Sequence, residues 1–112
     1  MTAIANDYSY EEVFSKQIEI LKEPAILVVI SASGSSPNVI RALESARNLG
    51  WKTIAFVGFD GGKILENSLA QHILYVKSSN YGVVEDVHQM IMHSVSQTIR
   101  YEHAKDLSKL KL

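Results

Sequence analysis

The sequence predicts one α/β domain, a three-layer sandwich in which helices cover a parallel sheet of three strands. Two short runs at residues 25–30 and 53–57 are almost continuously apolar and rich in β-branched residues, which suits strands covered on both faces. A stretch with helical spacing lies between them, and strand–helix–strand is the right-handed unit of parallel sheets. A third apolar run at 73–76 has polar neighbours and therefore predicts an edge strand. We expect the strands to lie in sequential order.

Length and composition are those of an ordinary globular chain. The 112 residues suffice for one domain, with 46% hydrophobic and 21% charged residues and a net charge of −1. This balance offers no basic surface for nucleic acid, and the absence of cysteine excludes disulfides and thiolate metal sites. The longest apolar run, 25–30, is far shorter than the ~20 residues that span a bilayer, and the N-terminus lacks a signal-peptide pattern. We therefore expect a cytoplasmic protein without a nucleic-acid or membrane partner.

The first element is predicted to be a helix that begins near Ser9. Ser9 and Glu12 have the spacing of a capping box, and apolar residues follow at helical intervals. Pro24 ends this helix, because its ring cannot continue the hydrogen-bond ladder. Asn6 and Asp7, just ahead of Ser9, are most simply part of the helix start.

Small polar residues fill positions 31–36, directly after the first strand. Pro37 suits the first position of a helix with Ser36 as its N-cap, and Gly50 ends that helix. Its buried face is predicted to hold Val39, Leu43 and Ala46. Hydroxyls, free backbone amides and the positive end of the helix dipole then meet at the carboxyl end of a strand, which indicates an anion site. The alternative is a capped helix behind a solvated serine loop.

The rest of the chain is predicted to hold a glycine-rich turn at 58–62, a short helix at 63–67 and a long last helix from Val83 to about Glu102. Apolar residues keep helical spacing along the last helix at Val84, Val87, Ile91, Val95 and Ile99. A polar stripe is formed by Glu85, Gln89, His93 and Gln97.

Two histidines lie on different faces of this last helix. His88 lies near the apolar side and His93 in the polar stripe, and for each one a satisfied or solvated ring is the alternative to a functional role. Glu85 and His93 are eight residues apart, about 12 Å along the axis. Both could serve one centre only by leaning toward each other, so the spacing alone requires no metal.

In combination these motifs resemble the sugar isomerase (SIS) domain family. The longest matching stretch is ILVVISASGSSPNVIRALESARNLGWKTIAFVGFDGGKI. Two further stretches, NDYSYEEVFSKQIE and VVEDVHQMIMHSV, resemble the phosphoheptose isomerase subgroup. The similarity covers residues 2 to about 100. It implies a truncated, flavodoxin-like SIS domain over 1–112, since family members carry further helices and two strands ahead of this region.

The resemblance also implies roles for individual residues. The hydroxyls of Ser31, Ser33 and Ser36 would bind the sugar phosphate, the role that the family gives to this loop. Asn6 and Asp7 would approach the sugar chain.

His93 would match the helix histidine that acts as acid or base when a proton moves between two carbons of an aldose–ketose pair. Some members hold zinc with that histidine and a glutamine eight residues earlier, where this chain has Glu85. A carboxylate can bind zinc as well, but it adds a negative charge.

The activity implied is conversion of sedoheptulose 7-phosphate to D-glycero-D-manno-heptose 7-phosphate. The family's catalytic glutamate lies ahead of the matched region, so we expect the chain by itself to be inactive. The strand at 25–30 would then have an open edge and an apolar face, which predicts a homo-oligomer or a complementing chain. The alternative is a non-catalytic adaptor, since some SIS proteins of this subgroup are scaffolds for a replication-initiation protein.

Overall fold

A parallel sheet of three strands forms the centre of the computed structural model, which describes residues 2–21 and 23–109. The strands are β1 (Ile26–Ser31), β2 (Lys52–Val57) and β3 (His72–Tyr75). Their order is β1-β2-β3, with Val29 opposite Ala55 and Ala55 opposite Ile73. This confirms the predicted sequential order and places β3 at an edge of the described sheet.

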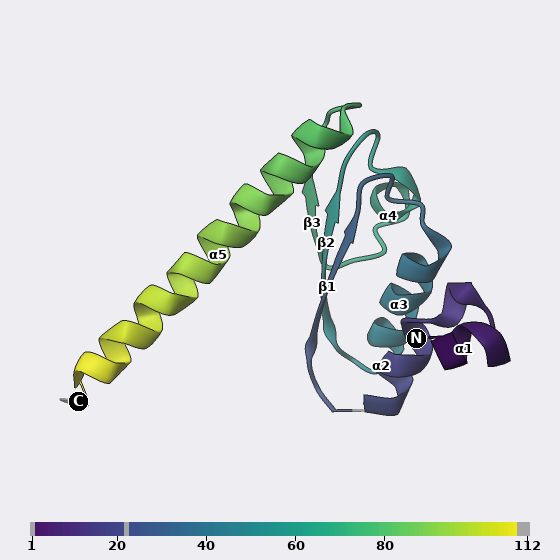
Figure 1. The fold of residues 1–112 in the computed structure, drawn as a ribbon, viewed down its shortest axis with the longest axis horizontal. Coiled ribbons are helices and arrows are strands. Elements are labelled where there is room, and N and C mark those ends of the chain that lie inside the picture. Colours follow the sequence, from purple (N-terminus) through teal and green to yellow (C-terminus); the bar gives the residue numbers. More distant parts are fainter. Residues whose placement is uncertain (1, 22, 110–112) are drawn as a thin grey trace.

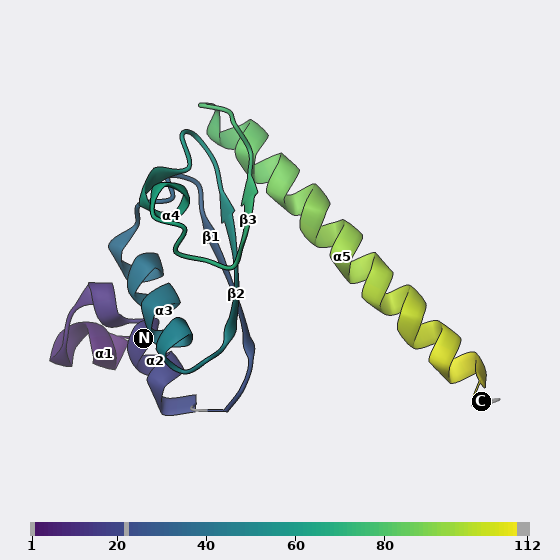
Figure 2. The same ribbon diagram turned by 180° about the vertical axis from the view of Figure 1, so that it is seen from behind.

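Helices lie on both sides of this sheet, as predicted (Figure 1). On one side lie α1 (Thr2–Asp7), the 3-10 helix η1 (Tyr10–Glu12), α2 (Ser15–Leu21), α3 (Pro37–Asn48) and α4 (Gly62–Glu66). On the other side α5 (Tyr81–Lys109) begins near the carboxyl ends of the strands and then runs away from the sheet, as the view from behind also shows (Figure 2). None of the described helices is both long and apolar enough to cross a bilayer.

The first helix differs from its prediction. Instead of one helix from Ser9 there are two pieces, η1 and α2, and Ser9 makes no side-chain capping bond. Tertiary contacts explain the break: Arg41 on α3 pairs with Glu11 at 3.0 Å and with Glu12 at 3.6 Å, and Val13 is buried between the pieces. These contacts hold the turn against α3 and outweigh local helix propensity. An unpredicted helix, α1, lies ahead of them.

The main core lies between the sheet and α3. It is formed by inward-facing residues of β1, β2, α3 and α4. Val39, Leu43 and Ala46 are buried on α3, as predicted. Trp51 belongs to a second cluster with Ile18 of α2.

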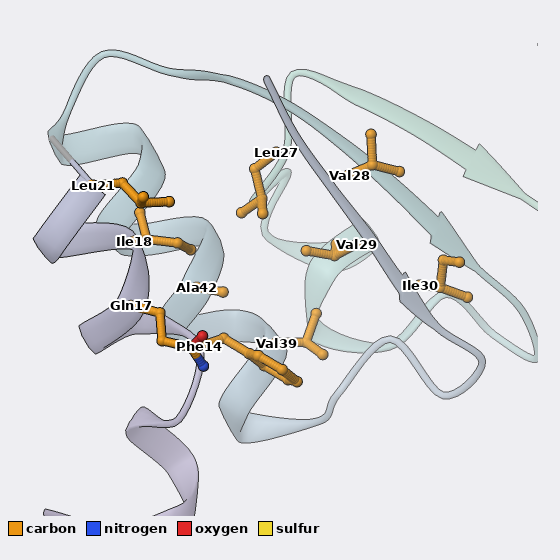
Figure 3. Close-up of a pocket in the computed structure, with 10 residues that line it drawn as sticks. All are labelled: Phe14, Gln17, Ile18, Leu21, Leu27, Val28, Val29, Ile30, Val39 and Ala42. Carbon is orange, nitrogen blue, oxygen red and sulfur yellow. The ribbon is translucent and has the colours of Figure 1, made fainter. Parts of the chain in front are cut away.

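β1 is covered on one face only in the described structure. Leu27 and Val29 point toward the helices beside an apolar groove, while Val28 and Ile30 point away from them (Figure 3). The outward residues Ile26, Val28 and Ile30 are 61%, 49% and 51% exposed. The apolar run of β1 predicted a strand buried on both faces. In the described structure the helices cover one face, and the other face is exposed.

Candidate functional site

The carboxyl end of β1 and the start of α3 position the serine loop, which we define as residues 31–36. Ser31 is buried, and its hydroxyl oxygen accepts the amide of Gly34 at 3.1 Å. Gly34 has φ 66°, a left-handed conformation that glycine adopts without strain. The loop therefore turns back sharply and carries its remaining serines toward the helix terminus.

A hydrogen bond joins two of the three predicted serines, and the third lies in the turn between them. Ser31 Oγ and Ser36 Oγ lie 3.2 Å apart, and Ser33 Oγ accepts the amide of Ser35 at 3.3 Å. Ser36 does occupy the N-cap position, with Pro37 at the start of α3, but its hydroxyl makes no capping bond. The predicted N-cap position of Ser36 is therefore confirmed, while its hydroxyl pairs with the buried Ser31 hydroxyl instead of the helix amides.

Several donors around the loop have no acceptor. Within the described part of the chain, the amides of Ser33, Ser36 and Asn38 make no hydrogen bond. They adjoin the positive end of the dipole of the 12-residue helix α3. Because Ser33 Oγ already accepts one amide, its own proton is free to donate outward. This arrangement can hold a small oxyanion.

The other predicted site residues lie elsewhere. Asn6 and Asp7 are exposed at the end of α1, and Glu85 and His93 are exposed on α5. No hydrogen bond or ion pair joins any of these four to the serine loop in the described structure. Nor do the described residues contain a cluster of three or more side chains that could hold a metal.

His88 is a buried histidine whose ring is satisfied by contacts within the fold, which was the alternative to a functional role. Its side chain is 2% exposed, and Nε2 lies 3.0 Å from the carbonyl oxygen of Val57. A carbonyl can only accept, so Nε2 carries the proton. The ring also meets Phe56 edge to face at 5.4 Å. His88 thus fastens α5 to β2.

One serine of the loop, Ser35, had no predicted role. Ser35 Oγ accepts the amide of Lys63 at 3.1 Å and so links the serine loop to the start of α4. The two residues are 28 positions apart in the chain. Local sequence patterns carry no signal for such a contact, and the sequence assigned Gly61 and Gly62 only to a turn.

The fold and this loop define an open parallel α/β domain with an oxyanion-binding loop at the carboxyl edge of its sheet. Comparison with known proteins gives the particular family. The chain belongs to the SIS domain family, whose sequence profile matches residues 1–58.

Individual relatives point to one subgroup. The chain is 46% identical over 94 residues to a phosphoheptose isomerase of Maridesulfovibrio salexigens. This alignment covers 83% of this chain and 45% of the relative. The chain is 43% identical over 100 residues to a probable phosphoheptose isomerase of Thermoplasma acidophilum, covering 88% and 54%. The chain thus spans about half the length of the curated relatives it matches.

Solved structures agree with this result. A phosphoheptose isomerase from Neisseria gonorrhoeae superposes with a TM-score of 0.80 at 37% identity, covering 88% of this chain and 55% of that one. A phosphoheptose isomerase from Francisella tularensis gives 0.77 at 36% identity, covering 83% and 50%. The resemblance seen in the sequence and the predicted fold class are both confirmed.

Proposed function

We propose that this chain is the phosphate-binding part of a phosphoheptose isomerase and holds sedoheptulose 7-phosphate by its phosphate group. The observation that carries the proposal is the serine loop itself, in which the Ser31 and Ser36 hydroxyls pair and the Ser33 hydroxyl keeps its proton, beside unbonded amides at the start of α3. Dianionic phosphate accepts several hydrogen bonds at once, and hydroxyls with a helix N-terminus supply them without a buried counter-charge. The names of the relatives support a phosphoheptose as the ligand, and the family resemblance of the sequence implies sedoheptulose 7-phosphate in particular.

The hydroxyls are arranged as a short relay. Ser31 Oγ accepts the Gly34 amide, so its proton is available to Ser36 Oγ. Ser36 can then direct its own proton to a phosphate oxygen, as Ser33 can. Each of these bonds would be charge-assisted and hence stronger than a neutral one.

Isomerisation itself requires groups beyond this loop. We propose that His93 transfers the proton between the two sugar carbons and that Asn6 and Asp7 bind the polyol chain. Isomerisation also needs a second catalytic base. In this proposal that base lies outside these 112 residues, so the chain alone binds the sugar without converting it. A zinc ion held by Glu85 and His93 would polarise the sugar oxygens, and its remaining ligands would lie outside these 112 residues.

The apolar surfaces of β1 and α5 support a further part of the proposal. A groove between the sheet and α5 is lined by Val28, Ile54, Phe56, Leu74, Met92, Val95 and Ser96. Apolar surface of this kind is typical of a protein interface. We propose that a second copy of the chain covers it, since one chain carries both an exposed sheet face and an exposed helix stripe.

The binding proposal is tested by titrating the chain with sedoheptulose 7-phosphate and following backbone amides by NMR. We expect saturable shifts at residues 31–39, and Ser33→Ala should weaken binding by about tenfold or more, because it removes a hydrogen bond to a charged group. Ser94→Ala is the matched control, since that hydroxyl bonds only to the carbonyl of Met90 in its own helix. The samples should form no aldoheptose.

Two results would count against the proposal. An unchanged spectrum at millimolar ligand would make phosphosugar recognition by this chain wrong and would favour the protein-binding adaptor. Equal weakening by Ser33→Ala and Ser94→Ala would place the ligand away from the serine loop.

A further inference from the structure

The serine loop is held in place by the next strand–helix connection along the chain. The amide of Gly58 donates to the carbonyl of Ala32 at 2.8 Å. At the start of α4 the amide of Lys63 donates to Ser35 Oγ at 3.1 Å, and the amide of Ile64 donates to the carbonyl of Gly34 at 2.9 Å. Three bonds from one segment therefore reach three residues of the serine loop, Ala32, Gly34 and Ser35.

These bonds make the beginnings of α3 and α4 chemically different. The first amides of α4 are already used: Gly62 donates to Asp60 Oδ1 at 2.9 Å, and Lys63 and Ile64 donate to the serine loop. The amides of Ser36 and Asn38 at the start of α3 make no bond within the described residues. An anion would therefore bind at α3, while α4 holds the loop that presents it.

Close backbone packing supports this division. A methyl group on Gly34 would collide with the backbone of Gly61, and one on Gly62 would collide with the carbonyl of Ser33 and the hydroxyl of Ser35. The two segments approach each other as closely as glycine permits. Movement of the α4 start would consequently move the serine loop.

Ser35 lies at this contact and makes two hydrogen bonds, one to α4 and one within the serine loop. Its hydroxyl accepts the Lys63 amide, and its own amide donates to Ser33 Oγ at 3.3 Å. The second bond occupies a lone pair of the Ser33 hydroxyl and leaves the Ser33 proton for a ligand. Ser35 thus joins the α4 start to the hydroxyl of Ser33 through its own side chain and amide, in addition to the backbone bonds of Ala32 and Gly34.

We infer that Ser35 is a positioning residue of the phosphate site: by accepting the Lys63 amide, it fixes the turn that aims the Ser33 hydroxyl and the α3 amides at the phosphate. This inference rests on the proposed function for the identity of the ligand. It assigns Ser35 no contact with the sugar or the phosphate.

The experiment compares wild type with Ser35→Ala, Ser35→Thr and Ser94→Ala in two NMR measurements. In ligand-free samples Ser35→Ala should shift the Ser33 and Asn38 amides and speed hydrogen exchange at Lys63. In a titration with sedoheptulose 7-phosphate it should weaken binding about three- to tenfold, the effect of one neutral hydrogen bond. Ser35→Thr keeps the acceptor and should restore both, and Ser94→Ala should match wild type.

The outcomes separate this inference from the proposed function. Binding by Ser35→Ala within twofold of wild type, with faster exchange at Lys63, would overturn the positioning role while leaving phosphate binding intact. Failure of the Thr variant to restore binding would also overturn it. If wild type itself does not bind, the proposed function is wrong, and the ligand-free amide shifts alone decide whether Ser35 holds the loop.

Discussion

Gly34 shows how strongly a single residue constrains the candidate site. It has φ 66°, and an added methyl group would collide with the backbone of Gly61. Gly50 has a similar φ of 75°, but nothing lies within 4 Å of the position that its methyl group would occupy. An alanine at Gly50 would therefore be destabilised by backbone conformation alone, and an alanine at Gly34 by backbone conformation and steric overlap together.

We predict that Gly34→Ala lowers the free energy of unfolding by about 3 kcal/mol and Gly50→Ala by about 1 kcal/mol. Both variants place a side chain in the left-handed region, and Gly34→Ala adds the cost of overpacking. Urea denaturation followed by circular dichroism measures both values. Equal destabilisation of the two variants would show that the loops are not packed as closely as the structure describes.

The same residues show what could be predicted about the site. The hydroxyls, Gly34 and the helix start at Pro37 are neighbours in the chain, so the sequence sufficed to locate the serine loop. The partner of the Ser36 hydroxyl is Ser31, and that choice depends on the folded path of the loop. The contact of Ser35 with Lys63 depends on how two loops pack, which no local pattern records.

At the scale of elements, the strands were predicted within one residue because each is a compact apolar run between polar turns. The first helix was not predicted correctly. Its apolar spacing is helical, but the ion pairs of Arg41 with η1 and the burial of Val13 favour a break. Such contacts come from α3, distant in the chain, and they outweigh the local signal.

The attachment of α5 to the sheet gives a prediction at this scale. His88 bonds to the carbonyl of Val57 and is almost fully buried, while His93, five residues later, is exposed. We expect His88→Leu to cost about 1 kcal/mol of stability, because one buried hydrogen bond is lost while the carbonyl of Val57 still accepts the amide of Val76. His93→Leu should change stability by less than about 0.5 kcal/mol.

Thermal and urea unfolding of the two variants measure this difference. Faster hydrogen exchange in the first turns of α5 should accompany His88→Leu, since that bond fastens the helix to β2. If His88→Leu is as stable as wild type and its α5 amides stay protected, the packing of Val84 and its neighbours holds α5 on the sheet instead.

At the scale of the whole molecule, α5 is too long for its own sheet to cover. Its 29 residues extend about 43 Å, whereas the six residues of β2 extend about 20 Å. Val84 near its start is fully buried, but Val95 and Ile99 are 52% and 64% exposed. The stretch of α5 around Val95 and Ile99 and the outward face of β1 thus remain as two apolar surfaces on one chain, an arrangement that suits reciprocal cover by a second copy.

We predict that the chain self-associates and that Val95→Lys weakens the association by at least about tenfold, because it places a charge in the apolar groove. Gln97→Lys is the matched control: it adds the same charge two residues further on, about 200° around the helix. Sedimentation equilibrium over a range of concentrations measures both. A monodisperse wild-type monomer would contradict self-association, and equal weakening by both variants would place the contact away from the groove. Weakening by Val95→Lys alone would assign the open face of the sheet to a second copy.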